Sequence, residues 1–73
     1  MEAKQIIMEL SEAQQRLTLI KGKLKDLIES SDWDKKLSDH RDQVVEKLRE
    51  IDQTINDIVD IQRNILLKIS EIN

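Results

Sequence analysis

Apolar residues recur at helical spacing along two long stretches of the chain. In the first stretch they alternate intervals of four and three residues, at Ile6, Leu10, Ala13, Leu17, Ile20, Leu24 and Leu27. This heptad rhythm is typical of a helix that packs one face against a neighbouring helix. It predicts a first helix over about residues 3–29.

The same rhythm continues in the second stretch, at Leu37, Val44, Leu48, Ile51, Ile55, Ile58, Ile65, Ile69 and Ile72. Two polar residues, Arg41 and Gln62, occupy positions of the same series. The pattern predicts a second helix over about residues 33–72. Residues 30–32 are then expected to form the turn between the helices.

Together these elements predict an all-α fold, an antiparallel two-helix hairpin of the coiled-coil type with helices of unequal length. The chain has 73 residues, no proline and one glycine, so we expect a single domain over residues 1–73 with few turns. Folding at Ser31 is expected to bring Leu24 near residues 37–41 and Leu17 near Leu48.

The unequal lengths predict an overhang. At 1.5 Å per residue the helices are about 40 and 59 Å long, which leaves roughly the last ten residues of the second helix without a partner. Past Ile58 the apolar residues also spread around the helix, which indicates more than one neighbour. The predicted partner or oligomer interface is Ile58, Ile61, Ile65, Leu66, Leu67, Ile69 and Ile72.

So short a chain, with one apolar seam and no cysteine, has marginal stability as a monomer. We therefore expect a homo-oligomer, with a dimer that forms a four-helix bundle as the simplest case, or a helical protein partner. The net charge of −3 argues against nucleic acid as the main partner. Two alternatives remain open: a small regulatory or nucleic-acid-associated factor of viral or mobile-element origin that uses Lys21, Lys23 and Lys25, and a structural coiled-coil subunit.

The break between the helices contains Ser31-Asp32-Trp33-Asp34. A serine or aspartate oxygen can accept the free amide hydrogens at the start of the second helix, and Asp34 favours its positive end. Trp33 is the only aromatic residue. We expect it to cover the hairpin tip by lying over Ile28 and Leu37, with an anchor for a partner as the alternative.

Catalysis, metals and cofactors find no support in the sequence. His40 stands beside Asp39 and Asp42, but a helix points these three side chains in different directions. Gly22 lacks the second glycine and the preceding strand of a phosphate loop. A glycine inside a helix marks a bend, a close contact or a tolerated defect. We expect a protein that is not an enzyme and holds no cofactor.

The longest uncharged apolar run, residues 64–67, is far too short to span a bilayer. The first residues also lack the charged-then-apolar order of a signal peptide. These features predict a soluble, cytoplasmic protein that does not act at a membrane.

The stretch from Leu17 through Leu48 resembles the flagellar export chaperones of the filament-cap protein. In both, an apolar helix ends in a short turn with an acidic-Trp-acidic sequence, here Asp32-Trp33-Asp34, before a helix rich in Arg, Glu and Leu. Ile51-Asp52, Ile55 and Gln62-Arg63 are similar to a later helix of that family. The resemblance implies a small chaperone or adaptor that shields an apolar helix of a secreted partner.

Overall fold

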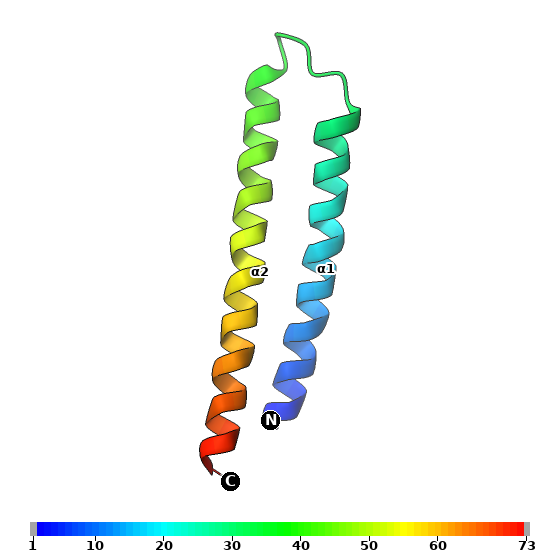
Figure 1. Cartoon of the computed structure of the whole chain (residues 1–73). Helices are drawn as coiled ribbons and strands as arrows, with labels where there is room; N and C mark the ends of the chain where they lie inside the picture. The colour runs from blue at the N-terminus through cyan, green and yellow to red at the C-terminus, as the bar shows by residue number, and fades with distance from the viewer. Residues whose placement is uncertain (1, 73) are drawn as a thin grey trace.

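The computed structural model describes the backbone of residues 2–72 and the side chains of residues 2–71. Two α-helices lie side by side and antiparallel, α1 (Ala3–Ser30) and α2 (Ser38–Ile72), joined by residues 31–37 (Figure 1). The molecule is a rod of 58 × 16 × 15 Å. The predicted all-α helical hairpin is confirmed.

One side of each helix faces the other and forms the interhelical seam. Its members are all half-buried and alternate intervals of four and three residues. On α1 they are Ala3, Ile7, Leu10, Gln14, Leu17, Lys21, Leu24 and Ile28. On α2 they are Val44, Leu48, Ile51, Ile55, Ile58, Gln62, Ile65 and Ile69. Burial of apolar surface drives the helices together, yet none of the described side chains is fully buried.

The seam predicted for the second helix is confirmed from Val44 to Ile69. It includes the polar Gln62, whose Nε2 donates a long hydrogen bond of 3.4 Å to the carbonyl oxygen of Ile7. Leu37 and Arg41 are exposed instead, so the seam predicted for them is wrong. The connection between the helices extends through residue 37, and residues 38–43 of α2 are all exposed, so the seam begins at Val44.

On α1 the predicted seam is correct only in part. Leu10, Leu17 and Leu24 face α2 as expected, but Ile20 and Leu27 are 45% and 42% exposed. Apolar residues of α1 lie in three parallel columns along the helix, and the residues within a column are spaced by seven. A single neighbouring helix covers two such columns. The third column is Ile6, Ala13, Ile20 and Leu27, which we call the apolar flank of α1.

The second helix begins at Ser38, five residues later than predicted. The Oδ1 atom of Asp34 accepts hydrogen bonds from the backbone N–H groups of Lys36 (2.9 Å) and Leu37 (3.1 Å). Leu37 N–H also donates to the Asp34 carbonyl at 3.0 Å, which closes a tight turn. Aspartate side chains compete in this way with regular helix hydrogen bonds. The expected turn at residues 30–32 is therefore extended to residues 31–37.

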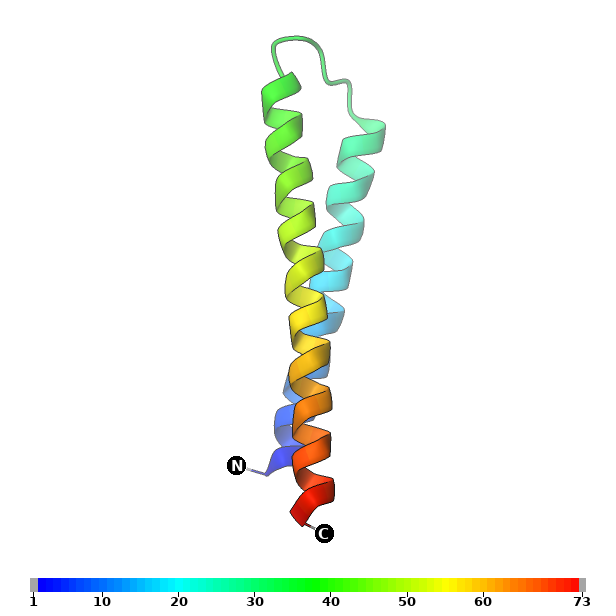
Figure 2. The same ribbon diagram turned by 60° about the vertical axis from the view of Figure 1, so that its left-hand side comes forward.

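The longer connection shifts α2 along α1 by about one helical turn. Leu24 lies beside Val44, and Ala3 at the start of α1 reaches Ile65 and Ile69. A shift of four residues keeps the same side of a helix facing its partner. The same residues of α2 therefore form the seam after the shift. Figure 2 shows that the end of α2 extends past the start of α1. Because Ala3 lines a groove together with Ile69, only the residues after Ile69 extend past α1. The expected ten-residue overhang is therefore wrong.

Gly22 lies in the middle of α1 on an exposed position, and a Cβ atom added there meets nothing within 4 Å. We expect Gly22→Ala to raise the free energy of unfolding by about 0.5–1 kcal/mol, because alanine loses less backbone entropy than glycine in a helix. Thermal unfolding followed by circular dichroism measures this change. A loss of stability would contradict the open space around Gly22.

Candidate interaction face

The apolar flank runs along α1 directly beside the seam. Its four residues follow one another at intervals of seven, so they lie in one line along the helix. Ile6 and Ala13 are half-buried, whereas Ile20 and Leu27 are exposed. A second helix lying alongside α1 could contact all four side chains.

The hairpin covers this flank only in part, although all four of its residues are apolar and one column of the seam is not. The seam column of α1 holds Gln14 and Lys21, whose side chains are only half-buried. Lys21 spans the two helices, with its Nζ 2.5 Å from Oδ1 of Asp52. Both side chains are substantially exposed, so this ion pair contributes at most about 1 kcal/mol.

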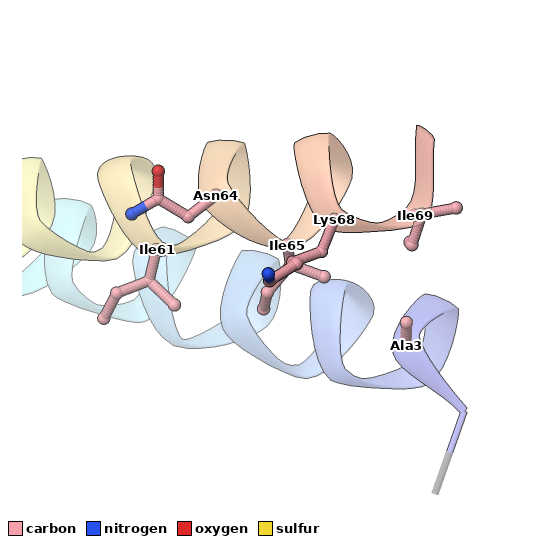
Figure 3. Close-up of a pocket in the computed structure, with 6 residues that line it drawn as sticks. All are labelled: Ala3, Ile61, Asn64, Ile65, Lys68 and Ile69. Atoms are coloured by element: carbon pink, nitrogen blue, oxygen red, sulfur yellow. The ribbon is translucent and has the colours of Figure 1, made fainter. Parts of the chain in front are cut away.

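α2 contributes Ile61 to the same side of the hairpin. Ile61 is 48% exposed and lines a shallow groove of about 320 Å³. Figure 3 shows the groove, which is formed by Ala3, Ile61, Asn64, Ile65, Lys68 and Ile69. Ile6 follows Ala3 by three residues, so the flank begins at the edge of this groove.

A second groove, of about 300 Å³, lies toward the hairpin tip. It is lined by Leu24, His40, Gln43, Val44 and Lys47. Ile20 and Leu27 are four and three residues from Leu24, which places the other end of the flank beside this groove. We define the interaction face as the flank together with Ile61; the two grooves border it at either end.

Charged residues border the flank on its outer side. Glu2, Glu9, Arg16 and Lys23 are exposed and follow one another at intervals of seven. The border is therefore acidic along the first half of α1 and basic along the second half. Any helix that binds this face meets an asymmetric charge pattern.

The structure distributes the predicted C-terminal interface over several sides of α2. Three of its residues belong to the seam: Ile58, Ile65 and Ile69. Three others are exposed: Ile61, Leu66 and Leu67. These three are about 100° or more apart around the helix, so they do not form one patch. Ile72 ends α2, and its side chain lies outside the described part of the structure.

The hairpin tip contains the predicted residues Ser31-Asp32-Trp33-Asp34. Trp33 is half-buried, and its Nε1–H donates a hydrogen bond of 3.2 Å to the carbonyl oxygen of Ile28. The last carbonyls of a helix have no partner within it, so this bond closes the end of α1. The hydrogen bond places the indole at the end of α1; the packing expected over the side chains of Ile28 and Leu37 stays a prediction.

The tip lysines stand in a mixed charged surface. Lys21 is paired with Asp52, and Lys23 and Lys25 are followed along the chain by Asp26 and Glu29. A phosphate-binding site needs clustered, unopposed positive charge. Among residues 2–71, no specific contact therefore favours the nucleic-acid alternative.

Within residues 2–72, no helix combines the length and the apolar character that crossing a bilayer requires. Among the side chains that the structure describes, no three His, Cys, Asp or Glu residues gather closely enough to hold a metal ion.

The heptad pattern of the sequence predicts the flank residues Ile20 and Leu27 on the inside of the hairpin, whereas the structure exposes both. The signal for a second contact was present in Ile7 and Ile28, which extend the apolar stripe of α1 to three columns. Such a stripe is characteristic of a helix with two neighbours.

Comparison with known proteins found no matching family model, curated protein or solved structure.

Proposed function

We propose that this protein is a non-enzymatic helical interaction module that binds another α-helix along the interaction face. The observation that carries the proposal is the apolar column of Ile6, Ala13, Ile20 and Leu27, in which the hairpin leaves Ile20 and Leu27 exposed and Ile6 and Ala13 only half-buried. An amphipathic helix laid in this position removes apolar surface from water on both partners.

The lack of fully buried side chains supports the same function. Every described residue of the seam is only half-buried, because two helices cannot enclose a core between them. A third helix packed beside α1 covers the flank and also the outer edge of the seam leucines Leu10, Leu17 and Leu24. Binding therefore stabilises the hairpin as well as the complex.

Shielding an apolar helix of a partner is also what the resemblance to flagellar export chaperones implies. The proposed binding surface differs from the residues that carry this resemblance. Trp33 is engaged in closing the tip through Ile28, whereas the interaction face lies along the length of α1. An adaptor or chaperone role thus rests on the face and not on the acidic-Trp-acidic turn.

Site-specific photo-crosslinking tests the proposal. A benzophenone amino acid at position 20 is expected to form adducts with a polypeptide, because Ile20 lies in the middle of the face. The matched control places the same group at Leu19, the neighbouring residue, which is 69% exposed and points away from the face. The reaction is carried out with the full chain in cells that express it.

Adducts from position 20 and few from position 19 support a helix-binding face. Equal yields from both positions, or none from position 20, would contradict it. Mass spectrometry of the adduct identifies the bound segment, and a partner segment without helical periodicity would also count against the proposal.

A further inference from the structure

We infer that the helix bound by the interaction face is α1 of a second copy of this chain, antiparallel to the first and related to it by a two-fold axis. The inference rests on the proposed function and names its partner. The shape of the face and its charged border point to this occupant, and the exposed area of the hairpin is large enough for the contact.

Two copies of the apolar flank are complementary in side-chain size when they run antiparallel. An axis near residues 16 and 17 pairs Ile6 with Leu27 of the second copy and Ala13 with Ile20 of the second copy, so that a small side chain meets a large one at the centre. A parallel arrangement pairs Ala13 with its own copy and leaves a gap there. Isologous contacts of this kind are the usual way in which dimers close.

The charged border fits the same arrangement. Reversal about this axis places Glu9 opposite Lys23 of the second copy, and symmetry makes this contact twice. A parallel arrangement places each of these charges against its own copy. Arg16 lies near the axis and faces its own copy in the antiparallel pair; its exposed side chain is free to turn toward solvent.

The exposed area of the hairpin is larger than a dimer contact needs. The chain exposes 6114 Å², whereas a compact monomer of 8.6 kDa exposes about 4,700 Å². The excess of about 1,400 Å² is larger than the roughly 800 Å² that each partner buries in an ordinary specific interface. The isolated hairpin therefore exposes enough surface for one such contact along α1.

The grooves at the two ends of the face receive the ends of the second α1. In the antiparallel pair, Leu27 of the second copy lies at the end of the face marked by Ile6 and Ile61. Ile6 of the second copy lies at the other end, near Leu24 and Val44. Each hairpin thus contributes both helices, although α1 makes the central contact.

Sedimentation equilibrium over a wide range of concentration tests the dimer. The wild-type chain is expected to show twice its monomer mass of 8.6 kDa. Ile20→Asp should weaken dimerisation roughly a hundredfold, because it places two charges in the apolar contact. Leu19→Asp is the matched control and should leave the dimer intact. Circular dichroism shows whether each variant keeps its helices.

Charge reversal tests the antiparallel register with variants that do not touch the apolar contact. Glu9→Lys and Lys23→Glu are each expected to weaken the dimer roughly threefold to tenfold, because each creates two like-charge contacts. The double variant has the same composition as the wild type and should recover its affinity. Equal weakening in the double variant would overturn the antiparallel register.

A wild-type chain that stays monomeric at every concentration would overturn the dimer, as would equal dissociation by Leu19→Asp and Ile20→Asp. These results are distinct from failure of the proposed function. If the chain is a monomer but position 20 crosslinks to a different polypeptide, the helix-binding face stands and the second copy is excluded as its partner.

Discussion

Replacing Leu48 by aspartate is expected to unfold the hairpin. Leu48 is a half-buried seam residue near the middle of α2. The substitution removes apolar contacts and leaves a carboxylate in the seam, which together cost about 3 kcal/mol or more. A single core of this size supplies only about 3–5 kcal/mol, so the loss approaches the whole stability of the fold.

Urea unfolding followed by circular dichroism measures the effect of Leu48→Asp. The control is Leu67→Asp, the same substitution on the same helix at a residue that is 57% exposed and lies outside the seam and the interaction face. It is expected to change the free energy of unfolding by no more than about 0.5 kcal/mol. Similar losses in both variants would mean that the seam does not hold the hairpin together.

Because association and folding are linked when a partner covers part of the fold, both variants should be compared at one protein concentration. If the free energy of unfolding of the wild type rises with protein concentration, the dimer contributes to its stability. Leu67→Asp should retain this dependence, since the substitution leaves the interaction face unchanged.

Removing the indole of Trp33 is the second large change. Trp33 is half-buried over the end of α1 and donates a hydrogen bond to the Ile28 carbonyl. An aromatic side chain buries about 150–250 Å² when it is fully enclosed. At about 25 cal/mol per Å², half of this area and the lost hydrogen bond predict that Trp33→Ala destabilises the hairpin by about 2.5–4.5 kcal/mol.

Trp33→Phe separates packing from hydrogen bonding. It keeps most of the ring and removes the N–H donor, so we expect a loss of about 1 kcal/mol. Far-UV circular dichroism during urea unfolding measures both variants. In the wild type, Trp33 is the only tryptophan, and its fluorescence reports on the tip alone. A negligible loss in Trp33→Ala would show that the tip closes without the indole.

The two predictions probe different parts of one rod. Leu48 tests the seam, which runs along both helices, and Trp33 tests the connection that sets their alignment. A change at the tip acts on the loop, whereas a change at the seam acts on the helices. In a double variant with milder substitutions at both positions, the two losses of unfolding free energy should therefore add within about 0.5 kcal/mol.

Helix type and the facing side of α2 follow from the sequence alone. Alternating intervals of three and four residues place Leu48, Ile55 and Ile65 on one side of a helix whatever its partner is. The same argument located Gln62 in the seam, where it bonds to the carbonyl of Ile7. These features depend on local periodicity, which a linear chain displays directly.

The tertiary structure decided the alignment of the helices and the side of α1 that remains open. The side chain of Asp34 closes a tight turn with Lys36 and Leu37, which delays α2 and removes most of the expected overhang. α1 has three apolar columns, and periodicity does not say which two a single partner covers. The contact with α2 settles that choice and leaves Ile20 and Leu27 exposed, which moves the candidate interface from the end of α2 to the flank of α1.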